Sequence, residues 1–133
     1  MEVIYSSSSH TNKLMKLKWK SIGLKKGLER HIPDEPGVYV IKSVERYLGL
    51  PVKHDVVYVG KSENLRRRYR EHSNFAKEHN AELLKRRLND PLEFWYAIAQ
   101  RGKIAFFEKE LISNLNPTVN KVRYVNHGEK LDD

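Results

Sequence analysis

The stretches GVYVI, residues 37–41, and VVYVG, residues 56–60, decide the fold of this chain. Both are rich in Val, Ile and Tyr, which favour β-strands, so we predict strands over about 37–43 and 55–60. Each carries one tyrosine, and the second is followed at once by Lys61 and the basic segment NLRRRYREH, residues 64–72. Two phenols beside a cluster of cations are expected where a phosphodiester is held and attacked, although packing in a hairpin would also explain the tyrosines.

The remaining chain alternates between helical and strand patterns. We predict helices over about 64–75, 77–89 and 103–115 and a third strand over about 93–99. The connection between the first two strands is predicted to be a long loop. This order predicts an α+β domain with a small, mostly antiparallel three-stranded sheet flanked by helices.

Composition limits the partners of the protein. The 133 residues include 25 Lys+Arg and 17 Asp+Glu, which gives a formal net charge of +8. This charge favours a polyanionic partner, nucleic acid before membrane. The absence of cysteine excludes disulfides and thiolate metal sites. No apolar run approaches the ~20 residues of a bilayer span, so we predict a cytoplasmic, nucleoid-associated protein with no membrane contact.

Residues 1–31 are predicted to form a basic, partly disordered N-terminal arm, and residues 32–133 the folded domain. The arm holds seven Lys or Arg and two Glu, so it carries +5 of the net charge. Its serine run favours disorder. Apolar residues farther along can dock a short amphipathic piece onto the core, namely Leu14, Leu17, Trp19, Ile22 and Leu24. The arm is either a DNA-contacting extension or a solvated leader, and both interpretations stay open.

The helix predicted near the C-terminus carries a carboxylate inside its apolar stripe. At about 100° per residue, the stripe comprises Ile104, Phe107, Leu111, Ile112 and Leu115. Glu108 falls inside the stripe, whereas Lys109 and Glu110 fall outside it. Burying a carboxylate is unfavourable unless it is paired or bound to a metal. Glu108 is therefore either a salt-bridge partner at the edge of the stripe or a metal ligand.

The helix predicted to begin near Asn64 points Leu65, Tyr69 and His72 to one side, with Arg68 beside them. The rigid guanidinium fork of Arg68 suits phosphate oxygens. His72 is either a hydrogen-bonded core histidine or a functional group. The other arginines of this helix point elsewhere: Arg66, Arg67 and Arg70. They form either a solvated cationic surface or salt-sensitive contacts to a DNA backbone.

Taken together, these motifs resemble the GIY-YIG nuclease family. The matching residues, in order, are Gly37-Val38-Tyr39, Tyr58-Val59-Gly60-Lys61, Asn64-Leu65, Arg68, His72, Glu108-Lys109-Glu110-Leu111-Ile112, Pro117 and Asn120. The resemblance covers roughly residues 33–121. Valine replaces isoleucine in both name-giving triplets, and Val119 stands where an aromatic residue is frequent. The histidine at position 72 resembles the phage and homing branches of the family.

The resemblance implies a DNA endonuclease that hydrolyses phosphodiester bonds with one Mg²⁺ or Mn²⁺ ion bound by Glu108. It implies that the catalytic residues are Tyr39, Tyr58, Lys61, Arg68, His72 and Glu108. We expect Tyr58 to act as the base or to orient the water, with Tyr39 supporting it. We expect Arg68 to stabilise the transition state. The predicted DNA contacts are Arg66, Arg67, Arg70 and Asn120.

These side chains are expected to converge around one gap of the size of an ion. One such site cuts one strand, so a double-strand break requires a homodimer or a second binding event. The chain length and the lack of cysteine favour a stand-alone phage, mobile-element or restriction-type enzyme. The alternative is a nucleic-acid-binding module that uses the same fold without turnover.

Overall fold

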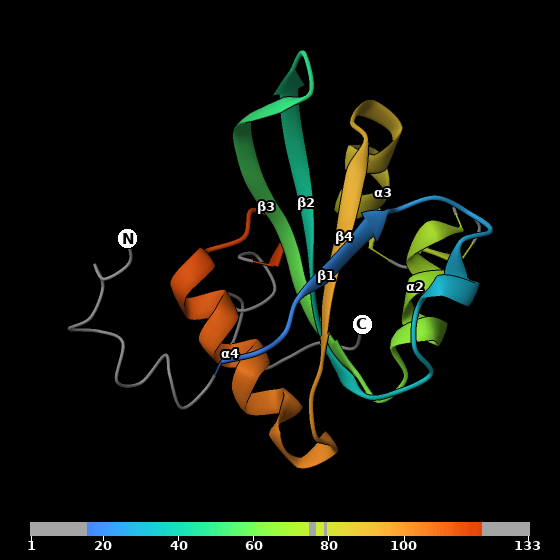
Figure 1. Ribbon diagram of the computed structural model, residues 1–133, viewed down its shortest axis with the longest axis vertical. Helices are drawn as coiled ribbons and strands as arrows, with labels where there is room; N and C mark the ends of the chain where they lie inside the picture. Colours follow the sequence, from blue (N-terminus) through green and yellow to red (C-terminus); the bar gives the residue numbers. More distant parts are fainter. Residues whose placement is uncertain (1–15, 75–76, 79, 121–133) are drawn as a thin grey trace.

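The computed structural model describes residues 16–74, 77–78 and 80–120. Within them, one antiparallel sheet has the strand order β1-β4-β2-β3 (Figure 1). The strands are β1 Lys20–Gly23, β2 Gly37–Tyr47, β3 Leu50–Ser62 and β4 Leu92–Ile98. The helices are η1 Glu29–His31, α2 Leu65–Ser73, α3 Ala81–Asn89, η3 Arg101–Lys103 and α4 Ile104–Leu115, of which η1 and η3 are single 3₁₀ turns.

The α+β class is confirmed, but the predicted three-stranded sheet is wrong, because the described sheet has four strands. The additional strand, β1, pairs with β4 from Lys20 opposite Tyr96 to Gly23 opposite Glu93. Its sequence, KSIG, contains one large apolar residue and gives no strand pattern. β1 forms because β4 offers it an edge of unpaired N–H and C=O groups. The serine run of the predicted arm lies outside the described residues.

The long loop predicted between the first two strands is also wrong. β2 and β3 continue to pair as far as Tyr47 opposite Leu50, so the turn consists of Leu48 and Gly49. Both turn residues have positive φ, 53° for Leu48 and 87° for Gly49. Positive φ at both central positions belongs to the type I′ hairpin turn, which favours Asn-Gly over Leu-Gly. Because this turn has leucine in place of the favoured asparagine, the sequence did not predict a hairpin.

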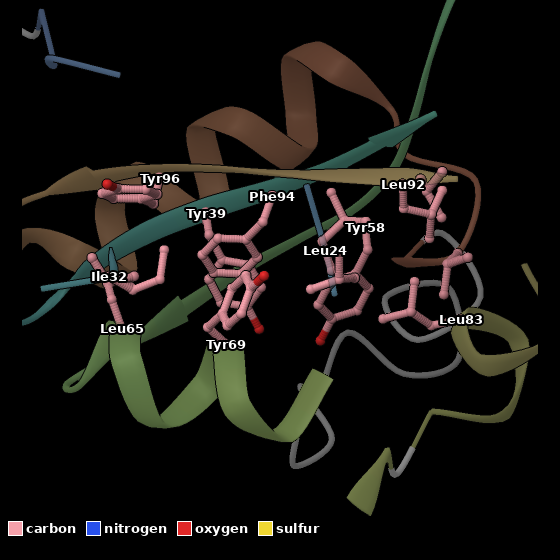
Figure 2. Close-up of a cluster of buried hydrophobic side chains, with 13 residues drawn as sticks. Leu24, Ile32, Tyr39, Tyr58, Leu65, Tyr69, Leu83, Leu92, Phe94 and Tyr96 are labelled. Carbon is pink, nitrogen blue, oxygen red and sulfur yellow. The ribbon is translucent and has the colours of Figure 1, made fainter. Parts of the chain in front are cut away.

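The sheet separates two helices. Side chains alternate between the faces of a strand. Tyr39 of β2 lies on the face that packs against Leu65 and Tyr69 of α2 (Figure 2). Its neighbour Val38 lies on the other face, in a cluster with Ile104 of α4. We call these the α2 face and the α4 face.

The segment after α4 covers the outer edge of β3. The backbone N–H groups of residues 118 and 119 donate to the carbonyl oxygens of Val56 and Val57. The Asn120 amide extends this pairing, since Oδ1 accepts from Val59 N at 2.6 Å and Nδ2 donates to Val59 O at 2.9 Å. Among the described residues, this cover ends at Val59, and residues 60–62 of β3 continue past it.

Replacing Asn120 by alanine tests this edge. We expect Asn120→Ala to lower the free energy of unfolding by about 2–3 kcal/mol, because it leaves the buried N–H and C=O of Val59 without their partners. Urea denaturation measures the change. The control is Asn114→Ala, an exposed asparagine on α4, with an expected change below about 0.5 kcal/mol. Equal effects of the two substitutions would contradict the role of Asn120 at the edge.

Candidate active site

Three polar side chains from three elements meet on the α2 face: Tyr39 of β2, Tyr58 of β3 and His72 of α2. Tyr39 Oη lies 2.7 Å from His72 Nε2. The ring centroids are 6.1 Å apart for Tyr39 and Tyr58, and 5.6 Å apart for Tyr58 and His72. All three residues are buried. Folding therefore brings both predicted tyrosines to the predicted histidine.

His72 has a second partner, Glu78, which sequence analysis missed. His72 Nδ1 lies 2.9 Å from Glu78 Oε1, and the Glu78 side chain is only 2% exposed. The two contacts fit a neutral imidazole that donates from Nδ1 to an ionised Glu78 carboxylate and accepts at Nε2 from Tyr39 Oη. Glu78 lies between α2 and α3, and no helical periodicity in the sequence links it to His72.

The Tyr39 side chain passes over Gly60 of β3 to reach His72. Tyr39 and Gly60 are directly opposite each other in the β2–β3 ladder, and a Cβ atom on Gly60 would collide with Cζ and Oη of Tyr39. Gly37 is constrained in a similar way, because a Cβ atom at this position would collide with the Ala97 carbonyl oxygen. The glycines of both triplets are therefore required by close approaches.

Arg68 and Lys61 come from different directions. Arg68 precedes His72 by one turn of α2, its side chain is 15% exposed, and its Nε lies 3.4 Å from Glu71 Oε1. Lys61 is opposite Val38 in the β2–β3 ladder. Because paired residues share a face, the half-buried Lys61 leaves β3 on the α4 face.

Glu108 approaches from the other side of the sheet. It is 3% exposed, whereas Lys109 and Glu110 beside it are exposed. Its helix, α4, packs on the α4 face and contacts β3 more extensively than β2. The structure thus places α4, which carries Glu108, and Lys61 on the face opposite the tyrosine–histidine group. The convergence of Glu108 with that group around one gap stays a prediction. Because β3 is the outer strand, the shortest route between the two groups passes around its edge.

The donor set at Glu108 fits a hard divalent cation. Across the described part of the chain, no three His, Asp or Glu side chains gather into a metal site. A single buried carboxylate suits an ion such as Mg²⁺, which keeps several waters and accepts phosphate oxygens as further ligands. Softer metals prefer imidazole or thiolate ligands. Glu108 therefore matches a cation that is held jointly with a phosphate.

The predicted DNA contacts fall into different environments. Arg67 and Arg70 are exposed on α2, and Arg66 is half-buried, with Nε donating to Ile32 O at 2.8 Å. Asn120 is 2% exposed, and its amide is engaged with Val59.

Two further tyrosines of the α2 face stabilise the framework. Burial raises the pKa of both Tyr69 and Tyr96. Tyr69 Oη donates to Gly23 O at 2.6 Å and accepts from Lys25 N at 3.0 Å, which ties α2 to the end of β1. With raised pKa values, both phenols stay neutral around pH 7, as suits structural groups.

Comparison with known proteins identifies the family. An α+β domain with this buried tyrosine–histidine group defines a candidate catalytic domain, and the family model for the GIY-YIG catalytic domain matches residues 35–123. The chain belongs to the GIY-YIG nuclease family, which confirms the resemblance seen in its motifs. No curated protein matches the chain.

Solved structures of the GIY-YIG N-terminal endonuclease domain of UvrC from Thermotoga maritima are similar to this chain. A tyrosine-to-phenylalanine mutant bound to its catalytic divalent cation is 24% identical with a TM-score of 0.45, and the match covers 71% of this chain and 97% of that chain. The magnesium-bound domain is 26% identical with a TM-score of 0.44, covering 71% and 98% respectively. In the described part of this chain, no helix is long and apolar enough to cross a membrane.

The close contact between the Tyr39 ring and Gly60 predicts what adding a methyl group at position 60 would do. Gly60→Ala places Cβ against the buried Tyr39 ring, so we expect the phenol to move away from His72 and the free energy of unfolding to fall by about 1–3 kcal/mol. The ¹⁵N resonances of the His72 ring report the lost hydrogen bond. Gly102→Ala is the control, because a Cβ at Gly102 meets no atom within 4 Å. An unchanged His72 spectrum in Gly60→Ala would contradict this close contact.

Proposed function

We propose that this chain is a divalent-metal-dependent DNA endonuclease that hydrolyses phosphodiester bonds. Its membership of the GIY-YIG nuclease family supports the reaction class. The formal net charge of +8 supports a polyanionic substrate. The observation that carries the proposal is the buried chain of hydrogen bonds from Tyr39 through His72 to Glu78.

This chain of hydrogen bonds gives Tyr39 a way to act as a base. A free phenol has a pKa of about 10 and is a weak proton acceptor at neutral pH. His72 Nε2 can take the Tyr39 proton as Tyr39 Oη takes one from the attacking water. Glu78, hydrogen-bonded to Nδ1, stabilises the imidazolium that results and acts as a positioning residue for the ring. We therefore assign to Tyr39 the proton transfer that sequence analysis gave to Tyr58.

The remaining predicted residues have supporting roles in this proposal. Tyr58, next to both Tyr39 and His72, orients the water. Arg68 and Lys61 stabilise the negative charge that grows on the phosphate in the transition state. Arg67 and Arg70 add attraction for the DNA backbone from the exposed surface of α2.

Glu108 is the proposed ligand of Mg²⁺ or Mn²⁺. Such an ion supplies Lewis-acid stabilisation of the scissile phosphate and the leaving oxygen. We place the site at the edge of β3 near Gly60 and Lys61, because α4, which carries Glu108, and the tyrosines lie on opposite faces of the sheet. DNA that enters this edge is within reach of both groups.

The enzyme is further proposed to be a stand-alone phage, mobile-element or restriction-type nuclease acting in the cytoplasm. The 133 residues contain no cysteine, so this domain itself holds no thiolate zinc site. One site cuts one strand, so cleavage of both strands uses a homodimer or two successive binding events.

Removing the charge of Glu108 separates catalysis from binding. We expect Glu108→Gln to abolish Mg²⁺-dependent nicking of supercoiled plasmid and to leave the affinity for DNA in EDTA within a few-fold of wild type, because the amide keeps the shape and loses the cation ligand. The control Glu110→Gln, an exposed residue of α4, retains activity. Nicking by Glu108→Gln would exclude Glu108 from the metal site, and DNA binding without nicking by the wild type would support a non-catalytic binding module.

The hydrogen-bonded chain makes a graded prediction. Tyr39→Phe deletes the hydroxyl and should lower the rate of strand cleavage about 10²–10⁴-fold, the usual contribution of a general base. Glu78→Gln should lower the rate less and change its dependence on pH, because the amide no longer stabilises an imidazolium at His72. Single-turnover rates between pH 5 and 9 provide the measurement, with Tyr47→Phe, an exposed tyrosine of β2, as the control. A Tyr39→Phe rate close to wild type would place the base elsewhere.

A further inference from the structure

A basic groove lies between β1 and the start of α2, on the side of the sheet remote from β3. Its volume is about 550 Å³. Its lining contains no Asp or Glu and includes five cations: Lys16, Lys18, Lys20, Arg30 and Arg66. Like charges gathered in one concave site raise the local potential and concentrate anions there.

The sequence builds one wall of the basic groove by alternation. Leu17 and Trp19 are half-buried and pack into the cluster on the α4 face. The lysines that alternate with them, Lys16, Lys18 and Lys20, are exposed. In an extended segment, alternate residues point to opposite sides. Lys20 is opposite Tyr96, whose ring belongs to the α2 face. The lysines therefore form a row on the α2 side of the sheet.

The opposite wall is fixed by α2. Arg66 Nε donates to Ile32 O at 2.8 Å, which holds the guanidinium against the segment after η1. This bond uses Nε, so the two Nη groups are not part of it. Most of the cations that line the groove precede residue 35, where the match to the family model begins.

The basic groove and the candidate active site lie at opposite ends of α2. Figure 2 shows Ile32 and Tyr96 beside the first turn of α2 and Tyr58 beyond its last turn. From Arg66 to His72 the helix advances about 9 Å along its axis. A DNA strand covers that span in about three nucleotide steps of 3.4 Å. The exposed Arg67 and Arg70 lie between the two ends.

We infer that the basic groove binds the phosphodiester backbone of the DNA substrate a few nucleotides away from the bond that is cut. The inference rests on the proposed function for the identity of the substrate. It assigns the lysine row to substrate affinity and not to the chemical step, because the groove is separated from Tyr39 and His72 by the length of α2.

A pair of variants matched in net charge tests the groove. Lys18→Gln/Lys20→Gln removes two cations of the row, and Lys53→Gln/Lys109→Gln removes two exposed lysines elsewhere, so both proteins have the same net charge. Fluorescence anisotropy in EDTA measures the affinity for labelled duplex and single-stranded DNA at several salt concentrations. We expect the groove variant to reduce the slope of log K against log[salt] by about 1.8 for duplex DNA, or about 1.4 for single strands, and the control to leave it unchanged.

Three results would overturn the inference: an unchanged slope in the groove variant, equal losses in both variants, or loss of binding explained by a lower melting temperature. Displacement of DNA by millimolar inorganic phosphate at constant ionic strength would instead assign the groove to free phosphate. Acylation of lysines, read by mass spectrometry, gives a second measurement, in which bound DNA should protect Lys18 and Lys20 and leave Lys53 reactive. Both assays are independent of cleavage, so binding at the groove by an inactive protein would contradict the proposed function and the link to a cut bond, and it would leave only the binding of a DNA backbone at the groove standing.

Discussion

The contact between Tyr39 and His72 depends on the absence of a side chain at Gly60. The β2–β3 ladder places Tyr39 directly opposite Gly60, and the phenol occupies the space that a Cβ atom would fill. The register of this ladder is fixed, because a shift of one strand by one residue would move all of its side chains to the opposite face of the sheet. The position of α2 is fixed independently by Leu65 and Tyr69 in the core. A hydrogen bond between two rigidly held elements is thereby formed before any substrate binds.

Local signals in the sequence were sufficient for much of this arrangement. The Val- and Tyr-rich stretches predicted β2 and β3, and helical spacing predicted that Leu65, Tyr69 and His72 share the buried side of α2. The helix predicted to begin near Asn64 has Asn64 as its N-cap, whose side chain accepts from Arg67 N at 3.0 Å. These features depend on residues near each other in the chain, which propensity and periodicity describe well.

The features that sequence analysis missed depend on contacts between distant segments. β1 is a strand because it pairs with β4, and its own four residues have no strand pattern. Glu78 has a role because its carboxylate contacts His72, six residues earlier in the chain. The burial of Glu108 followed from the stripe on α4, but the place of α4 itself on the face opposite the tyrosines follows from the connection of α4 to β4. Topology, and not side-chain pattern, decides that separation.

The groups proposed for short-range chemistry and those proposed for long-range attraction lie toward opposite edges of the sheet, β3 and β1. Proton transfer and cation binding need groups within hydrogen-bond distance, and the residues proposed for them come from β2, β3, α2, α4 and the segment after α2. Electrostatic attraction acts over roughly 8–10 Å at moderate salt, so the lysines at the β1 edge can guide a strand without touching the reacting phosphate. Groups this far apart with no shared partners contribute to binding almost additively. A chain can therefore gain affinity at the β1 edge through additional lysines without disturbing the buried tyrosine–histidine–glutamate group, which tolerates little change in shape.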